Sequence, residues 1–578
     1  MPALNKSSFV LIAALAAAHI SYAQVPSTND TSDPYFNTGS GTLALHSLTT
    51  SNCTESGSGA FSACYNSGFG YQSLYLNSTG WGNSAFGSQA LLNNKTGSGN
   101  TASGFSALAY NPAGNNNTAV GFEAVMGSGS GETPASGSNN TGVGANTIAS
   151  YTSGSNNSAL GYYALYTNNT GYDNTATGYQ ALMSNAFGYE NTASGANALL
   201  NNSGGNYNSA FGSSALQSNT TSYYNTAVGA QALINVTGGG NTGVGYQALN
   251  GAGSPNIGSG SYNTAIGTQA LYAFTTGTNN TASGAAALNG NTTGSDNTAS
   301  GYGALSSNVS GSYNTGSGYQ ALLANTSGLY NTAAGYEALI SNTTGQQNTA
   351  SGVYALHDNS TGLYNTASGV DALYSNTTGS SNIAEGYKAG FKLTTGSNNI
   401  DIGSPGVAAE SGVIRIGTIT GSTSTQTATY IAGIYNVTTG GLPVVIDSKG
   451  QLGTTSSSQR FKTAIAPLGS ESEKLRELRP ISFRYKADPR GELRYGLIAE
   501  EVAQVYPELV VRNEQGRIDG VRYDELAPLL LNEVQKQSAE IRELKERLKS
   551  VDEMQQQLTE THALLLKLQS KDAGAPQR

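Results

Sequence analysis

A single pattern of apolar and polar positions repeats through the middle of the chain. Three consecutive copies read NTASGYGALSSNVSGSY, NTGSGYQALLANTSGLY and NTAAGYEALISNTTGQQ. Each copy holds a glycine, which we call the marker glycine, and the fourth residue after it is Leu in 16 of 20 copies. Sixteen of the 19 spacings between marker glycines are 17 residues, and the others are 23, 16 and 22. The marker glycines are Gly70, Gly87, Gly104, Gly121, Gly144, Gly161, Gly178, Gly195, Gly212, Gly229, Gly245, Gly267, Gly284, Gly301, Gly318, Gly335, Gly352, Gly369, Gly386 and Gly403.

A 17-residue period predicts one coil of a β-solenoid. It is too short for helix-pair repeats, which need about 33 residues or more, and Gly, Asn and Thr are poor helix formers. We expect two short strands and two turns per coil, with positive φ at the marker glycine and a second turn at the Asn-Thr-Thr-Gly stretch. The Leu column, for example Leu91, Leu182 and Leu322, should face inward. With neighbouring coils about 4.8 Å apart, the whole set of coils makes a rod of roughly 95 Å.

The pattern changes twice after the last marker glycine. Residues 404–456 contain short β-branched runs with Gly between them, which predicts a β neck. Residues 475–480 then end a helix, 481–485 alternate as a strand, 495–502 lead from strand to helix, and 521–526 open a last helix.

The last helix carries a heptad seam, because its apolar residues fall at alternating spacings of four and three. This seam predicts a multi-stranded coiled coil, and the alternative is one amphipathic helix on a monomeric core. The seam positions are Leu530, Val534, Gln537, Ile541, Leu544, Leu548, Val551, Gln555, Leu558, His562 and Leu565.

Charge divides the chain into two parts that must pack by different rules. Residues 24–456 hold five Lys or Arg and 15 Asp or Glu, whereas residues 457–578 hold 20 of each. The net charge of −9 lacks the basic footprint of a nucleic-acid-binding protein. Four His and two Cys exclude a zinc framework and a dense disulfide scaffold, and we expect neither a metal nor a cofactor.

The first 23 residues predict an export signal. Lys6 is followed by ten apolar residues, Phe9 to Ala18, a run too short to span a membrane. Ser21 and Ala23 have the small size that signal peptidase requires, so we expect cleavage after Ala23 and a secreted or cell-surface location. The alternative is a buried N-terminal helix. We expect no transmembrane segment after the signal is removed.

The two cysteines lie in the exported part of the chain. In an oxidising compartment Cys53 and Cys64 are expected to form a disulfide that closes a small loop near the start of the rod. Two free thiols are the alternative.

The Asn-Thr-Ala-x-Gly-Tyr-x-Ala-Leu repeats resemble the left-handed β-roll heads of trimeric autotransporter adhesins over about residues 67–403. The period is longer here than in the best-known heads. The resemblance implies a homotrimer with an adhesin-like role, whose ligand would be a glycan or another cell-surface molecule. A thin coil with few large apolar groups also buries little surface by itself, which favours association.

Two aromatic columns and one pair of acids could form binding or catalytic sites on the rod. Half of the marker glycines precede Tyr or Phe, and a second column places Tyr before Asn, as at Tyr313 and Tyr330. These rings could stack on sugars, or on one another and on neighbouring subunits. Asp173 and Glu190 share a column in adjacent coils, about 5 Å apart if exposed, the separation of a retaining glycosidase pair. The alternative is two solvated surface acids.

Residues 457–545 are similar to the intramolecular chaperone domain of endosialidase tailspikes, a family of self-cleaving serine peptidases. The matching stretches are Ser457-Ser458-Gln459-Arg460-Phe461-Lys462, Gly496-Leu497-Ile498-Ala499-Glu500-Glu501-Val502 and Tyr523-Asp524-Glu525-Leu526-Ala527-Pro528-Leu529-Leu530. The resemblance implies a domain that trimerises, templates the fibre upstream of it and then cuts itself off.

The family's cleavage motif is Ser-Asp-x-x-x-Lys, often with Arg two residues before the Lys. Ser457 and Lys462 match the Ser and the Lys, Arg460 matches the Arg, and Ser458 departs from the family Asp. The resemblance therefore implies cleavage between Ser456 and Ser457 by a Ser–Lys dyad, with Arg460 in support. His562 is the one His of this region, so a Ser-His-Asp triad is not available there. A lysine acts as the base only if burial lowers its pKa by several units from about 10.4.

Together these features predict a mostly β protein: a homotrimeric solenoid fibre, a β neck, and a small α+β chaperone domain that ends in a trimeric coiled coil. Its function is predicted to be that of an exported, adhesin-like fibre whose chaperone cleaves itself once and acts on no other substrate. A glycan-degrading tailspike and a fibre that never cleaves are the alternatives. The expected segments are 1–23 signal, 24–66 cap, 67–403 rod, 404–456 neck, 457–526 chaperone and autopeptidase, 527–570 coiled coil and 571–578 disordered tail.

Overall fold

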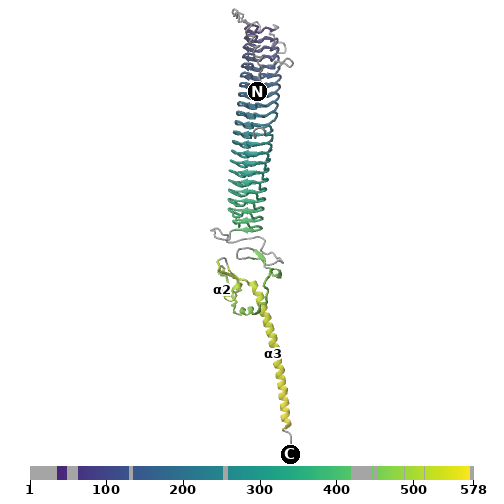
Figure 1. The fold of residues 1–578 in the computed structure, drawn as a ribbon, viewed down its shortest axis with the longest axis vertical. Coiled ribbons are helices and arrows are strands. Elements are labelled where there is room, and N and C mark those ends of the chain that lie inside the picture. Colours follow the sequence, from purple (N-terminus) through teal and green to yellow (C-terminus); the bar gives the residue numbers. More distant parts are fainter. Residues whose placement is uncertain are drawn as a thin grey trace, which may run out of the picture. The chain divides into compact units, whose positions relative to one another are not determined.

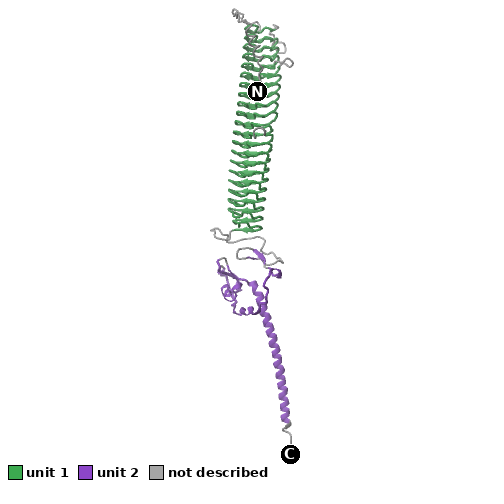
Figure 2. Cartoon of the chain, viewed as in Figure 1, with its two compact units in different colours: residues 1–418 green, residues 419–578 purple. Residues whose placement is uncertain are grey.

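The computed structural model describes residues 36–48, 63–128, 135–251, 258–417, 444–446, 452–454, 456–486, 488–512 and 515–572. The chain divides into two compact units, residues 1–418 and 419–578 (Figure 1, Figure 2). The expected signal sequence, Cys53 and most of the expected neck lie outside the described residues. Among the described residues, no helix has both the length and the apolar character that a membrane span requires.

The first unit is a β-solenoid whose coils contribute strands to one parallel sheet. Twenty-two strands pair in register, so that Thr315 lies beside Thr332 and Ser317 beside Ala334. The strands up to the middle of the rod are β1 (Thr38–Ser40), β2 (Ser67–Phe69), β3 (Ser84–Phe86), β4 (Thr101–Ser103), β5 (Thr118–Val120), β6 (Thr141–Val143), β8 (Ser158–Leu160), β10 (Thr175–Thr177), β11 (Thr192–Ser194), β12 (Ser209–Phe211) and β13 (Thr226–Val228). The remainder are β14 (Thr242–Val244), β15 (Thr264–Ile266), β16 (Thr281–Ser283), β17 (Thr298–Ser300), β18 (Thr315–Ser317), β19 (Thr332–Ala334), β20 (Thr349–Ser351), β21 (Thr366–Ser368), β22 (Ile383–Glu385), β23 (Ile400–Ile402) and β24 (Ile414–Ile416).

Most coils hold one strand and not the two that the sequence predicts. The exception is a short parallel pair, β7 (Ser150–Tyr151) and β9 (Thr167–Asn168). In the other coils the chain opposite the strand is a turn in which alternate residues are left-handed, as at Gln320 (φ 53°) and Leu322 (φ 56°). Its amides still bond from coil to coil, because Leu322 N donates to Ala338 O at 3.0 Å. The period therefore predicts the stacking correctly, but β-propensity alone does not predict these left-handed residues.

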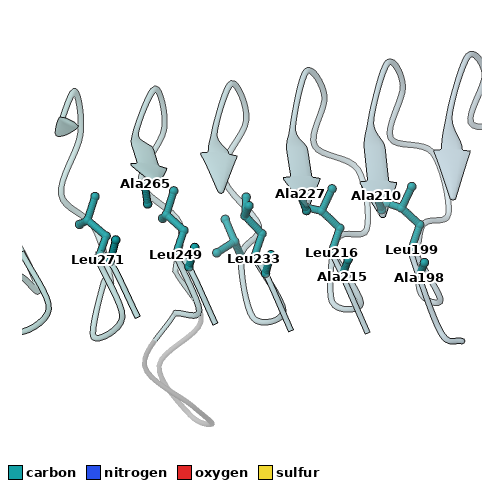
Figure 3. Packing of buried hydrophobic residues seen from close by; sticks show 14 of the residues in the cluster. Ala198, Leu199, Ala210, Ala215, Leu216, Ala227, Leu233, Leu249, Ala265 and Leu271 are labelled. Carbon is teal, nitrogen blue, oxygen red and sulfur yellow. The ribbon is translucent and has the colours of Figure 1, made fainter. Parts of the chain in front are cut away.

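The core is a narrow stack of Leu and Ala columns. Leu199, Leu216, Leu233, Leu249 and Leu271 are fully buried and follow one another from coil to coil (Figure 3). Ala residues from the strands and from the position before each Leu fill the remaining space. The inward Leu column and positive φ at the marker glycines are both confirmed; Gly318, for example, has φ 135°.

A column of buried asparagines runs beside this core. The residue before each strand, from Asn66 to Asn399, is Asn in all 20 coils and is at most 1% exposed. At Asn314 the backbone amide donates to Asn297 Oδ1 at 3.0 Å, and Nδ2 donates to Gly328 O at 2.8 Å. Its own Oδ1 accepts from the Asn331 amide at 2.9 Å. Each side chain therefore satisfies backbone groups of neighbouring coils, which a buried turn otherwise leaves unpaired.

A second buried Asn column lies at the turn after the Leu. Asn342 Nδ2 donates to Asn325 Oδ1 at 2.9 Å and to Gly345 O at 3.1 Å, and both side chains are fully buried. The column is interrupted where larger residues take its place, as at Tyr151 and Phe274. Hydrogen-bonded amides thus supply much of the cohesion that large apolar side chains provide in other cores.

Charged residues occupy the interior at the C-terminal end of the rod. Asp401, in β23, replaces the inward Ala of earlier strands and is 1% exposed. Arg415, in β24, lies opposite it in register and forms an ion pair with Glu410 at 2.7 Å. Inward-pointing charges at a sheet edge oppose the stacking of a further strand, and β24 is the last strand of this sheet among the described residues.

The second unit is small and mixed. Its strands pair as antiparallel hairpins: β25 (Val444–Ile446) with β26 (Leu452–Thr454), β27 (Ile481–Phe483) with β28 (Arg494–Gly496), and β29 (Val510–Arg512) with β30 (Ile518–Val521). Its helices are η1 (Gln459–Phe461), η2 (Gly469–Glu477), α2 (Ala499–Val505), η3 (Pro507–Leu509) and α3 (Tyr523–Asp572). A core of Val502, Tyr506, Leu509, Val510, Leu526 and Leu529 joins α2, η3 and the start of α3.

Candidate functional site

The predicted dyad is formed by one short turn. η1 separates Ser457 from Lys462, with Ser458 before the turn and Lys462 directly after it. The Lys462 amide donates to Gln459 O at 3.0 Å, which folds the chain back on itself. As a result, Lys462 Nζ donates to Ser457 Oγ at 3.1 Å. The geometry thus joins the two groups that nucleophilic catalysis needs, a hydroxyl and an amine within hydrogen-bond distance.

Arg460 makes a different contact. Its guanidinium lies over the Phe461 ring, 4.7 Å from the ring centroid. A cation held over an aromatic face in this way is oriented by the ring rather than by the dyad. We therefore assign Arg460 to the shape of the turn, and its support of the dyad stays a prediction.

Solvent surrounds the dyad in the single chain. Residues 456–471 are all exposed, including Phe461 and Ile465, each 64% exposed. Lys462 Nζ acts as the hydrogen-bond donor toward Ser457 Oγ in this contact. Among the described residues of the single chain, the two groups are in place without the low-dielectric surroundings that make a lysine a base.

A polar cluster attaches η2 to α3 close to the dyad in sequence. Glu533 is buried and accepts from Arg476 at 2.7 Å and from Ser472 at 3.3 Å. Its hydrogen bonds with Arg476 hold the pKa of the Glu533 carboxyl below its usual value. Asn532 donates to Ser472 Oγ at 2.7 Å, and Tyr506 donates to Glu471 O at 2.6 Å. The cluster fixes the segment that follows the dyad to the long helix.

The seam residues of α3 are exposed in the single chain. Leu530, Val534, Ile541, Leu544, Leu548, Val551, Leu558 and Leu565 are each between 51% and 71% exposed. An apolar stripe of this length is typical of a surface that binds another chain, and the coiled coil stays a prediction. His562 also lies on this exposed part of the helix.

The aromatic columns of the rod stack mainly on themselves. Tyr302, Tyr319 and Tyr336 follow one another with centroids 5.5 and 5.1 Å apart, and Tyr313 stacks on Tyr330 at 4.9 Å. Tyr319 has a stacked ring on each face, whereas Tyr313 and Tyr330 each cover one face of the other. This arrangement favours the interpretation that the rings stack on one another over the interpretation that they stack on sugars.

Asp173 and Glu190 occupy equivalent positions in adjacent coils, as the period predicts. Both are exposed and left-handed, with φ 56° and 53°. Tyrosine rings surround them, and the charge of Glu190 is the main reason why the pKa of Tyr207 is raised. The pair remains a prediction as a catalytic site.

One cluster on the rod was not expected from the sequence. His357 Nδ1 lies 2.6 Å from Asp358 Oδ1, its Nε2 lies 3.7 Å from Glu337 Oε2, and its ring stacks on Tyr374 at 4.6 Å. The neighbouring Tyr336 hydroxyl bonds to Glu337, which raises the pKa of Tyr336 to about 12. The repeat contains a signal for this cluster. Glu337 lies two residues after a marker glycine, a position that is often Gln and is acidic in only a few coils.

The expected disulfide and the expected cleavage bond are only partly described. Cys64 is fully buried, whereas Cys53 lies outside the described residues, so their pairing stays a prediction. Ser456 and Ser457, on either side of the expected cleavage bond, are both exposed. An exposed bond is open to attack from the adjacent hydroxyl.

A family comparison identifies the segment that holds the dyad. Residues 457–511 match the family described as the chaperone of endosialidase, Peptidase_S74. The second unit carries an endosialidase-type chaperone domain. The match begins at Ser457, and the chaperone domain follows a solenoid of about 20 coils, as the sequence predicts. Neither the comparison with curated proteins nor that with solved structures gave a match.

Proposed function

We propose that the protein is an exported homotrimeric fibre with an adhesin-like role, whose chaperone domain assembles the fibre and then cleaves itself off before Ser457. The observation that carries the proposal is the 3.1 Å contact between Lys462 Nζ and Ser457 Oγ at the first residue of the matched chaperone segment. The exposed seam of α3 supports assembly through the same unit.

Cleavage takes place in two steps. Lys462 accepts the proton of Ser457 Oγ, and the oxygen attacks the carbonyl carbon of Ser456. The proton passes to the nitrogen of Ser457 as the Ser456–Ser457 amide bond breaks, which leaves an ester between the two residues. Water then hydrolyses the ester and yields a new carboxylate at Ser456 and a free amine and hydroxyl at Ser457.

Assembly controls the first step. The dyad is exposed in the single chain, and a lysine becomes a base when burial disfavours its charged form. Exposed apolar residues around it, such as Phe461, Ile465 and Leu468, provide a surface that partner chains would cover. Cleavage therefore follows correct association of the chaperone domains and reports that the fibre has formed.

The repeat explains why a removable chaperone is useful. Coils with nearly identical sequence can pair out of register, and non-local β assembly is slow and prone to aggregation. A fast-associating trimer at one end fixes stoichiometry and register. Its removal eliminates the path back, so that the fibre is kinetically trapped.

Intact-mass measurement of the expressed full chain tests the proposal. The wild type should break before Ser457, and the Ser457→Ala and Lys462→Ala variants should stay whole. Ser458→Ala is the matched control and should still be cut, because Ser458 lies outside the dyad. An uncut wild-type trimer would overturn autocleavage, and an uncut monomer would overturn the trimeric fibre as well.

A further inference from the structure

The outward-facing side chains of the solenoid strands form one continuous surface. We call the first and third residues of the 22 sheet strands the strand face, since the middle residue of each strand points into the core. The strands are in register throughout. The strand face is therefore two parallel rows of side chains that run the length of the described rod.

Charge is sparse over the whole rod, and most of the acids in its middle stretch lie off the strand face. No Lys or Arg occurs between residues 96 and 387, so the acids of this stretch have no balancing cations. Glu123, Glu337 and Asp371 lie two residues after a marker glycine, and Asp173, Glu190 and Asp296 lie just before the Asn column. Among the described residues of the strand face, Glu385 is the one charged side chain.

Exposed apolar residues occupy the strand face in parts of the stretch from β2 to β15 and again from β22 to β24, whereas β16 to β21 carry Thr, Ser or Ala there. Leu160 is 53% exposed and Ile414 is 68% exposed, and the rings of Phe69 and Phe86 stack at 5.1 Å. Thr, Ser and Ala fill most other positions. The apolar members are Phe69, Phe86, Val120, Val143, Leu160, Phe211, Val228, Val244, Ile266, Ile383, Ile400, Ile402, Ile414 and Ile416. Depletion of charge together with exposed apolar side chains is the mark of an interface core.

We propose that the strand face is the surface through which copies of this chain associate along the rod. This inference rests on the proposed homotrimer and names the face that it uses. A second copy is the partner that fits, because its rows have the same spacing and can match this face along the whole rod. Identical copies also carry identical acids, which would repel one another across an interface. The placement of those acids on the other faces removes this repulsion.

The proposal is tested in the full chain by inserting two charges on the strand face and, as a control, two charges on a different face. Val228→Glu with Val244→Glu places two charges on the strand face, where Glu385 shows that the column accepts Glu. Gln231→Glu with Gln247→Glu places the same charges on the same two coils in the column that holds Glu123 and Glu337. After chaperone release, the strand-face variant should fall to one-third of the wild-type mass by analytical ultracentrifugation, and the control should keep the wild-type mass.

The outcomes separate this inference from the proposed function. A strand-face variant that stays trimeric and dissociates at the wild-type temperature would overturn the choice of face and leave the trimer standing. A monomeric wild type would overturn both. Loss of mass in both variants would show that the effect is not specific to the strand face and would also overturn the choice of face.

Thiol cross-linking provides a second test that does not depend on inserted charge. Ser317→Cys lies on the strand face, and Ser327→Cys lies in an exposed turn of the same coil. A short bifunctional thiol reagent should join Ser317→Cys chains into covalent pairs and leave Ser327→Cys chains single. Cross-linking of Ser327→Cys without Ser317→Cys would overturn the proposal.

Discussion

Lys462 Nζ lies 3.1 Å from Ser457 Oγ because a single 3₁₀ turn brings together residues five positions apart. Such a local arrangement needs no long-range contact to form. The contact therefore lies within one short segment, whereas the proposed mechanism takes the burial that activates the amine from other chains. On that proposal, position and activation of the dyad have separate sources.

Lys462→Arg should abolish cleavage as completely as Lys462→Ala. Arginine keeps the positive charge and can still donate to Ser457, but it cannot give up its proton in a protein. Intact mass and ultracentrifugation should show an uncut trimer. An Arg variant that is cut at the wild-type rate would show that Lys462 acts through its charge and not as a base.

Asn314→Ala should destabilise the middle of the rod by about 3 kcal/mol, because it leaves buried backbone groups of the neighbouring coils without partners. The groups are the Gly328 carbonyl and the Asn331 amide. Hydrogen exchange of the full chain should show faster exchange in the coils next to residue 314. Thr315→Ala, on the exposed side of the same coil, should change exchange little, and equal effects from both variants would contradict a structural role for the Asn column.

Gly318→Ala should be far more damaging than Gly303→Ala. Gly318 has φ +135°, and a Cβ there would lie 2.2 Å from Gly335 O. Gly303 has φ +63°, and its nearest neighbour would be 3.5 Å away. We expect a loss of more than about 3 kcal/mol at Gly318 and about 1 kcal/mol at Gly303. Thermal unfolding of the full chain compares the two, and similar midpoints would contradict the close approach of successive coils.

Asp401→Asn should stabilise the end of the rod at neutral pH and have no effect in acid. Burial, and then the charge of Glu410, raise the pKa of Asp401 to about 6. The folded state therefore holds this proton more tightly than the unfolded chain does. The stability that it contributes is complete below the unfolded pKa of about 3.9 and is lost as the pH rises through the folded value.

The measurement for this variant is hydrogen exchange in β23 and β24. At pH 7.5 the Asn variant should be more protected by about 1–2 kcal/mol, a value that allows for partial screening by solvent. At pH 4 the variant and the wild type should coincide. Asp371→Asn, at a partly buried position two coils earlier, is the control and should show no difference at either pH; greater protection of Asp401→Asn at pH 4 would contradict the assignment.

The repeat predicts the columns that large or special residues define. The burial of Leu322 and the positive φ of Gly318 both follow from the period. A large apolar side chain that recurs from coil to coil belongs in the core, and a glycine that recurs in every coil indicates a backbone angle that other residues rarely adopt. The role of Asn314 was missed, since Asn is usually a turn residue and its burial depends on the coils on both sides. Its invariance in all 20 coils, greater than that of Leu, is the signal that could have revealed it.

The sequence predicts which residues make up the candidate site, but not how their side chains are directed or how exposed they are. The motif predicts Ser457 and Lys462, and the two side chains form a hydrogen bond in the structure; their catalytic role stays a prediction. The position of Arg460 over Phe461 could not be predicted, because a motif records residue types and not side-chain directions. The exposure of the dyad is likewise a property of the folded chain, and spacing along the sequence carries no information about it.

The second Asn column has a practical consequence for production of the protein. Asn325, Asn342 and Asn376 each begin an Asn-x-Ser or Asn-x-Thr acceptor sequence for N-linked sugars. Each is fully buried, and its amide nitrogen bonds to the adjacent Asn of the column. A sugar attached in a eukaryotic secretory pathway would occupy the space of the next coil, so such a host should yield glycosylated chains that cannot close their coils.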